Sequence, residues 1–232
     1  MNMARLFLVV SLGLAASMAV RAQSPAEQAA AARFLEPLQN PDGGFPEVPG
    51  GPSTLRRTNI ASRALKFTGG VIGNVPACAK FVRSCFDEAA GAFAASPGGR
   101  ADVPSTAIGL IAGPEVLLPM EDITKRSIAF FHEHAKTFEE IRVAVAGLEA
   151  VSTPSPDFEA WRRQIEADRN PDGSWGQGAG RARATGAAAA ALLRMKMPLE
   201  HRDAIVAAMR DGQRSDGGWG DADGPSDFPS SY

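Results

Sequence analysis

The sequence predicts an all-α protein made of repeated helical hairpins, and two observations support this fold class. One short turn motif recurs along the chain, and the segments between its copies space apolar residues three or four positions apart. The clear copies are Asn40-Pro-Asp-Gly-Gly-Phe45, Asn170-Pro-Asp-Gly-Ser-Trp-Gly176 and Arg214-Ser-Asp-Gly-Gly-Trp-Gly220. The last two lie 44 residues apart, a period typical of stacked supersecondary units. Alternating β-branched runs are missing, so strands are expected to be almost absent.

A weaker copy of the turn, Asp87-Glu-Ala-Ala-Gly-Ala-Phe93, extends the repeat. The aromatic residues that end the four copies are separated by 48, 82 and 44 residues: Phe45, Phe93, Trp175 and Trp219. The middle interval is about twice the others, which leaves room for one more repeat. We therefore expect a further copy whose turn has decayed, centred near Thr137 and Phe138.

Each residue type in the turn has a local reason to be there. Proline fixes φ, the aspartate side chain accepts hydrogen bonds from the amides that follow it, and glycine takes the positive φ values that other residues avoid. The aromatic residue can then pack between neighbouring units. The residues expected to form the clear turns are Asp42, Gly43, Gly44 and Phe45, then Asp172, Gly173 and Trp175, and finally Asp216, Gly217, Gly218 and Trp219.

Each predicted repeat runs from a turn to an inner helix and then to an outer helix. The outer helices have charged residues between regularly spaced apolar ones, which indicates one solvated face; they are expected over residues 24–40, 120–136, 157–170 and 199–214. The inner helices contain smaller and more apolar residues, which allow close packing; their cores are residues 105–112, 143–148 and 184–193.

Helix starts are marked by residues that favour N-caps. We expect caps at Ser53-Thr54, at Ser105-Thr106 and at Thr137. Thr137 is followed three residues later by Glu140, which is the spacing of a capping box.

The turns, together with Phe81-Val-Arg-Ser-Cys-Phe86 before the second one, resemble the repeats of protein prenyltransferase β-subunits and squalene-hopene cyclases. The resemblance covers the chain from about Ser24 to Tyr232. It implies an α/α-toroid, in which inner helices surround a central cavity and outer helices enclose them. The motif is specific for the fold but not for the chemistry.

The catalytic motifs of these families are not found at matching positions. The prenyltransferase metal site resembles an Asp-x-Cys with a later histidine, and no Asp-x-Cys occurs here. The acid motif of the cyclases has a partial echo in Asp221-Ala-Asp-Gly224, which leaves Asp221 and Asp223 as weak catalytic candidates; a solvated turn is the alternative. We therefore identify no catalytic residue with an intact family motif, no metal site and no cofactor.

The remaining charged and metal-binding residue types allow two interpretations. Arginines at or near the starts of inner helices are candidates for binding an anionic ligand at the cavity mouth, or form ion pairs at its rim: Arg57, Arg142, Arg181 and Arg183.

His132 and His134 are two positions apart, so on a helix they point about 200° apart and cannot share a metal ion. A solvated helix face is the expected environment of this pair.

The N-terminal residues 1–22 read as a signal peptide. Arg5 precedes an apolar run over residues 6–20, and Val20-Arg-Ala22 offers a cleavage site. The run is too short for a clear membrane span, so no stable span is expected after cleavage. These features predict an exported protein, periplasmic or extracellular, with one repeat domain over residues 23–232. An uncleaved anchor is the alternative.

Charge and cysteine content narrow the function further. The formal net charge of −2 provides no basic field for nucleic acid. The two cysteines, Cys78 and Cys85, are seven positions apart on one predicted helix, about 10 Å, which is beyond disulfide reach. They are expected to be thiols in the core.

Residues 225–231 resemble the loop and cap that begin an inner helix. The sequence therefore suggests either a fragment whose last repeat is truncated, which we take as the hypothesis, or a ring left open at one side. An open ring exposes apolar surface that a partner usually covers.

Two hypotheses for the function follow. The first is a non-catalytic scaffold that binds a hydrophobic small molecule or a protein in its concave cavity. The alternative is an isoprenoid-handling transferase or cyclase whose active site is displaced or lies beyond Tyr232. The missing motifs favour the scaffold.

Overall fold

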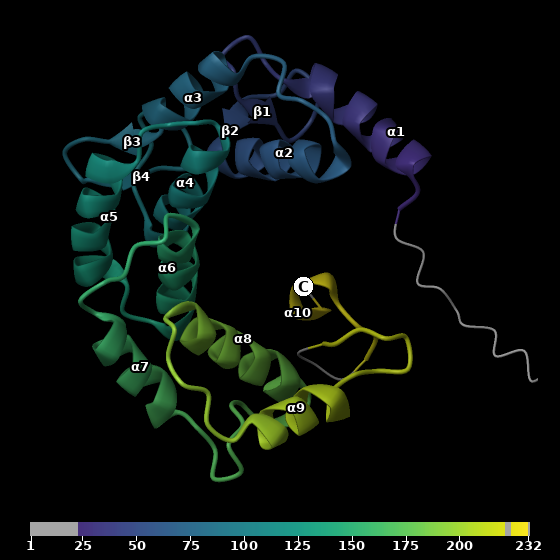
Figure 1. The fold of residues 1–232 in the computed structure, drawn as a ribbon, viewed down its shortest axis with the longest axis vertical. Helices are drawn as coiled ribbons and strands as arrows, with labels where there is room; N and C mark the ends of the chain where they lie inside the picture. The colour runs from purple at the N-terminus through teal and green to yellow at the C-terminus, as the bar shows by residue number, and fades with distance from the viewer. Residues whose placement is uncertain (1–22, 221–223, 232) are drawn as a thin grey trace, which may run out of the picture.

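Two layers of helices form a curved arrangement in this computed structural model, which describes residues 23–220 and 224–231 (Figure 1). Helices on the concave side pack against one another in chain order: α2 (Leu55–Thr68), α4 (Val103–Glu115), α6 (Phe138–Ala150) and α8 (Arg181–Arg194). Helices on the convex side cover them: α1 (Pro25–Leu35), α3 (Val75–Ser84), α5 (Glu121–His134), α7 (Phe158–Ala167) and α9 (Arg202–Asp211). The mostly helical fold and the order turn, inner helix, outer helix agree with the sequence prediction.

Short elements occupy the connections. They are the 3-10 turns η1 (Glu36–Leu38) and η2 (Gly178–Gly180), and a four-residue helix α10 (Phe228–Ser231) on the concave side. Two antiparallel pairs of strands are also present: β1 (Phe45–Pro46) with β2 (Ser53–Thr54), and β3 (Phe86–Asp87) with β4 (Ala92–Phe93). Each strand is only two residues long, so the expected near absence of strands agrees with the described residues. The short pairs form where the chain folds back beside a turn and pairs its backbone groups.

The outer helices are shorter than their apolar periodicity suggests, and local backbone signals explain why. Pro37 ends the regular hydrogen bonding of α1, so that 3-10 geometry follows Leu35. His201 has a left-handed φ of 53°, which places the start of α9 at Arg202. Residues 168–170 belong to the turn after α7, where Arg169 forms a bridge with Trp175.

Two of the three predicted caps are correct. Thr54 caps α2 by accepting a hydrogen bond from Arg57 N–H at 3.2 Å, and Thr137 forms a full capping box with Glu140 at the start of α6. The predicted cap at Ser105-Thr106 is wrong. Asp102 caps α4 instead, because its carboxylate accepts from Ser105 N–H at 2.6 Å, and Thr106 lies inside the helix.

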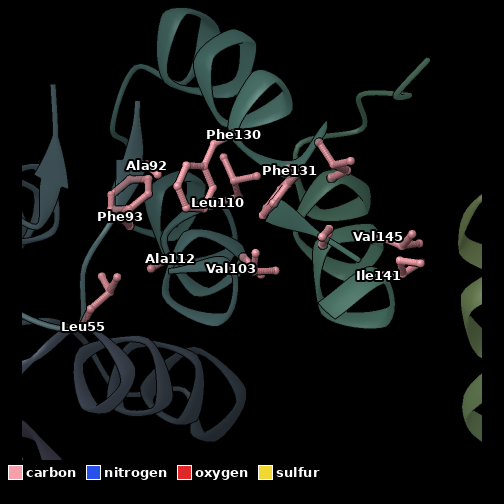
Figure 2. Close-up of a cluster of buried hydrophobic side chains, with 14 of the residues drawn as sticks. Leu55, Ala92, Phe93, Val103, Leu110, Ala112, Phe130, Phe131, Ile141 and Val145 are labelled. Carbon is pink, nitrogen blue, oxygen red and sulfur yellow. The ribbon is translucent and has the colours of Figure 1, made fainter. Parts of the chain in front are cut away.

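The core lies between the two layers and forms one cluster from Phe45 to Ile205, part of which is shown in Figure 2. Phe93, Phe130 and Phe131 fill the space between α4 and α5, and each is buried. Burial of one such side chain stabilises the fold by about 1.5–3 kcal/mol. Small residues occupy the contacts between the inner helices and let them approach closely: a methyl group on Gly147 would lie 2.8 Å from the Cα of Ala107. The inner layer therefore packs backbone against backbone, as its composition predicts.

The three clear turns share one hydrogen-bonding pattern. Their middle glycines, Gly43, Gly173 and Gly217, have φ values of 89°, 89° and 86°. Each donates its N–H to the residue three positions earlier, at 2.9 Å in every copy. The aspartate before each glycine accepts from the second N–H beyond itself, at 2.9, 3.0 and 3.0 Å. The aspartates accept and the middle glycines have positive φ as the sequence reasoning expects, whereas Gly44 and Gly218 are not among the glycines with positive φ.

A hydroxyl group in the first turn of the following helix fixes each aromatic residue. The backbone N–H groups of Phe45, Phe93 and Trp175 donate to threonine hydroxyls of α2, α4 and α8, each at 3.0 Å: Thr58, Thr106 and Thr185. The N–H of Trp219 donates to Ser231 of α10 at 2.8 Å. These hydroxyls join each turn to its inner helix, and the sequence analysis did not identify them.

The expected decayed turn near Thr137 and Phe138 is absent rather than distorted. Helix α5 ends at His134 and α6 begins at Phe138, so only three residues connect them. Thr137 is the N-cap of α6 as Thr54 is of α2, which makes Ile141 the counterpart of Thr58. Ile141 is fully buried. Without a turn there is no aromatic N–H to satisfy, and an apolar side chain takes the hydroxyl's position.

Replacement of Thr106 by valine tests the role of these hydroxyls. Thr106→Val keeps the shape but leaves the buried N–H of Phe93 without its acceptor, so we expect a loss of about 1–3 kcal/mol in the free energy of unfolding. Urea denaturation measures this. The control is Thr68→Val, since the Thr68 hydroxyl donates only to carbonyls of its own helix. Equal losses in the two variants would contradict the proposed role.

Gly43 and Gly217 occupy the same position of two turns but differ in what surrounds them, so alanine at each distinguishes the cost of backbone strain from the cost of tight packing. Gly217→Ala forces alanine to a φ near 86° in open surroundings, and we expect a cost of about 1–3 kcal/mol. Gly43→Ala adds overlap with the backbone of Ala77 and Cys78 in α3, which costs about 1–3 kcal/mol more. Thermal or urea unfolding of both variants measures the difference. Indistinguishable stabilities would show that the first turn does not pack tightly on α3.

Candidate binding face

The inner helices expose one stripe each, and the stripes are in register. The hydroxyls that bind the turns align α2, α4 and α8, and the cap at Thr137 aligns α6 with them. In this alignment the position two residues after Thr58, Thr106, Ile141 and Thr185 is, in every helix, an aliphatic residue that is not fully buried: Ile60, Ile108, Val143 and Ala187. Ile60 is 47% exposed and the others are half-buried. We call these four residues the aliphatic row.

From the packing of the helices we infer that the aliphatic row faces the concave side of the arc. Each inner helix is covered by outer helices on its convex side and by its neighbours on its flanks, so its accessible stripe faces inward (Figure 1). One turn further along, the stripes continue with Arg63, Ile111, Ala146 and Ala190. The concave face is therefore apolar at its centre, over α4 and α6.

Three of the four predicted arginines form ion pairs beside this face. Arg57 pairs with Glu47 at 2.5 Å, Arg142 with Glu139 at 2.8 Å, and Arg181 with Asp172 at 2.5 Å. Arg183 is exposed on α8. The pairs agree with the interpretation of these residues as rim ion pairs, and each pair is partly solvated, so its contribution to stability is small.

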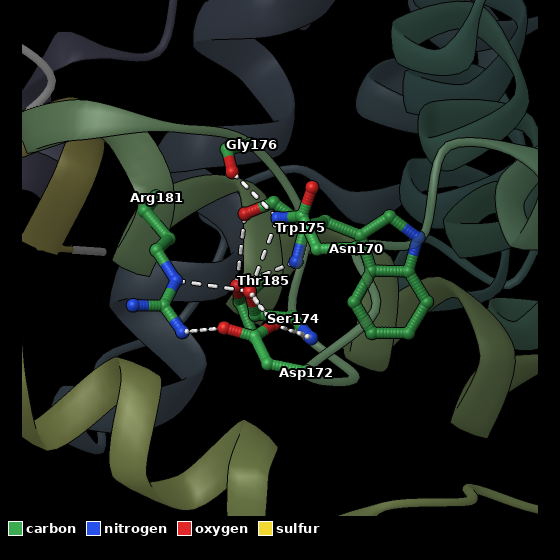
Figure 3. Close-up of polar contacts among 7 residues, drawn as sticks. All are labelled: Asn170, Asp172, Ser174, Trp175, Gly176, Arg181 and Thr185. Carbon is green, nitrogen blue, oxygen red and sulfur yellow. Dashed lines mark hydrogen bonds and ion pairs between the residues drawn. The ribbon is translucent and has the colours of Figure 1, made fainter.

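The turn before α8 shows how polar contacts hold the rim (Figure 3). The Arg181 guanidinium reaches both the Asp172 carboxylate and the Ser174 hydroxyl, the latter at 2.9 Å. Hydrogen bonds from the hydroxyl and N–H of Ser174, together with the charge of Arg181, lower the pKa of Asp172. On the other side of the turn, the Trp175 indole N–H donates to the carbonyl of Ile165 in α7 at 2.8 Å. Hydrogen bonds thus join this turn to the inner helix α8 and to the outer helix α7.

Both thiols lie in the core, as predicted, and neither forms a disulfide. Burial raises the pKa of Cys78 to about 11 and that of Cys85 to about 12. The reactive form of cysteine is the thiolate, so these side chains are unsuited to nucleophilic roles at neutral pH.

The histidines of α5 face different partners. His132 Nδ1 lies 2.8 Å from Asp157 at the start of α7, whereas His134 stacks on Phe130 with ring centroids 4.1 Å apart. Over residues 23–220 and 224–231, no cluster of three metal-binding side chains is found. Asp221 and Asp223, the weak acid candidates, lie outside the described residues.

Two open clefts lie outside the aliphatic row. The larger, about 620 Å³, lies between the turn at residues 87–91 and α5, and Arg100, Phe130, Glu133 and His134 are among its lining residues. The smaller, about 370 Å³, lies where η2 and the start of α8 meet the end of α9. The first cleft combines both signs of charge with an aromatic stack.

Comparison with protein-family models and with curated proteins finds no match to this chain. Within the described residues, none of the helices has the length and apolar character needed to cross a bilayer.

Sequence reasoning missed the aliphatic row because it looked for charged and metal-binding residues. The signal is nonetheless present in three of the four helices: Ile60, Ile108 and Val143 each lie six residues after the N-cap, whereas Ala187 lies seven residues after Gly180, the N-cap of α8. Alignment of α2, α4 and α6 by these N-caps brings together three of the four row members.

The lowered pKa of Asp172 predicts a pH effect on stability. A carboxylate with a depressed pKa stabilises the fold above its ordinary pKa near 4, and this contribution is lost as the pH falls through the folded value. We expect Asp172→Asn to lower the urea midpoint at pH 7, and its deficit against the unmodified protein to shrink as the pH falls below about 4. Glu133→Gln, an exposed change in α5, is the control. A deficit independent of pH would contradict this prediction.

Proposed function

We propose that this chain is a binding scaffold whose concave face holds a partner molecule along the aliphatic row. The observation that supports this most directly is the repetition of an accessible aliphatic side chain at one register position in four helices, exposed at Ile60 and half-buried in the other three. Repeat proteins use such concave surfaces for binding. Contiguous exposed apolar side chains are usually covered by a ligand or partner.

The proposal includes the architecture and the location that the sequence suggests. The succession of turn, inner helix and outer helix, and the curvature of the arc, support an α/α-toroid of the prenyltransferase and squalene-cyclase kind (Figure 1). The apolar N-terminal segment supports export, with the scaffold acting in the periplasm or outside the cell. Neither feature assigns a reaction, so the proposal is binding.

Native mass spectrometry of the protein purified from its own host tests this function. We expect the unmodified protein to carry a bound species, whether a small apolar molecule or a protein, and Val143→Asp to lose it, because a carboxylate in the aliphatic row cannot be buried cheaply. The control is Val206→Asp on the convex helix α9, where Val206 is 39% exposed. This variant should keep the species.

The same experiment can overturn the proposal. An unmodified protein without any bound species, or a species that Val143→Asp retains as fully as Val206→Asp does, would contradict binding at the concave face. Circular dichroism of both variants establishes that they are folded.

A further inference from the structure

Helix α2 differs from the other inner helices in what its exposed stripe contains. The stripe consists of Arg56, Ile60, Arg63 and Phe67, so that cationic and apolar side chains alternate along one face of the helix. Phe67 is 71% exposed and Ile60 is 47% exposed. The Arg63 guanidinium lies 5.9 Å from the centroid of the Phe67 ring. We call these four residues the α2 stripe.

The positive charge of the inner layer is concentrated at its two ends. Helix α2 contains four basic residues and no acidic one, and α8 contains three basic residues and no acidic one. The chain as a whole has a formal charge of −2, so this basic character is local. Between these ends, α4 and α6 provide the apolar centre of the concave face.

Most cations of the inner layer are already neutralised by acidic neighbours. Lys66 pairs with Glu115 of α4 at 2.7 Å, and Arg194 pairs with Glu149 of α6 at 2.9 Å. In the described part of the chain, by contrast, neither Arg56 nor Arg63 forms an ion pair. The two arginines of the α2 stripe therefore remain available to carboxylates from another molecule.

The spacing of the stripe restricts what can occupy it. Arg56 and Arg63 are seven positions apart, or about 10 Å along the helix axis, with Ile60 between them and Phe67 one turn beyond. An anionic amphiphile has a single charged head and can satisfy only one end of such a pattern. An amphipathic helix presents carboxylates and apolar side chains at the same repeating distances.

We propose that the α2 stripe anchors an acidic amphipathic segment of a partner protein. Carboxylates of the segment pair with Arg56 and Arg63, and its aliphatic side chains pack on Ile60 and Phe67 before continuing along the aliphatic row. Arginine and aromatic residues are the types that dominate binding energy at protein interfaces. This proposal rests on the proposed function, since it identifies the class of partner that the concave face holds.

Two synthetic peptides test this proposal on the full chain. One is an 18-residue helix-forming peptide with leucine along one face and glutamate beside it, and the other has lysine in place of every glutamate. Fluorescence anisotropy measures their binding. We expect the glutamate peptide to bind, the lysine peptide to bind at least tenfold more weakly, and an increase in salt to weaken the glutamate complex.

Charge reversal in the α2 stripe provides the matched comparison. The double variant Arg56→Glu, Arg63→Glu should bind the glutamate peptide at least tenfold more weakly than the unmodified protein. The control variant Arg163→Glu, Arg210→Glu makes the same change in net charge at exposed positions of α7 and α9, and it should bind as the unmodified protein does. Thermal unfolding of both variants shows that they are folded.

Three results would overturn this proposal: no binding of the glutamate peptide, equal binding of both peptides, or equal binding to both double variants. These results differ from failure of the proposed function. If Val143→Asp releases the natural bound species while Arg56→Glu, Arg63→Glu retains it, then the concave face binds a partner but not an acidic one. If Val143→Asp retains it, the scaffold function itself is wrong.

Discussion

The hydrogen bond from the backbone N–H of each turn aromatic to a hydroxyl of the next helix is the contact on which the repeat depends. It fixes the aromatic ring between the layers and sets the rotation of the inner helix at the same time. Because Thr58, Thr106 and Thr185 occupy one register, the faces of α2, α4 and α8 are aligned. The aliphatic row on the concave side is a direct result of that alignment.

Much of the fold could be predicted from the sequence because its signals are local. Glycine at positive φ, aspartate as an acceptor and threonine at a helix start each act within a few residues, so the turns and most caps were recognised. The cap at Asp102 was missed because Ser105 and Thr106 are equally good candidates by type. Only the structure shows that the Thr106 hydroxyl accepts a hydrogen bond from the N–H of Phe93.

The candidate site was much harder to predict, since it depends on which face of each helix remains uncovered. The buried Thr58 and the exposed Ile60 are only two positions apart, which is within the uncertainty of a helix boundary predicted from sequence. The ion pairs of Arg57 and Arg181 likewise depend on Glu47 and Asp172, whose positions follow from the folded turns. The ion pairs and the aliphatic row can be identified only when the rotation of each helix about its axis is known.

The different sizes of side chains in the two layers also explain the bend of the chain. At the inner joints, Gly147 meets Ala107 and the helices nearly touch, whereas the convex layer contains Phe130, Phe131 and Trp161. Each repeat is therefore a wedge, narrow on the inside and broad on the outside. The radius of the arc is encoded in residue volume: bulkier residues at the narrow joints would straighten it, and smaller ones in the convex layer would do the same.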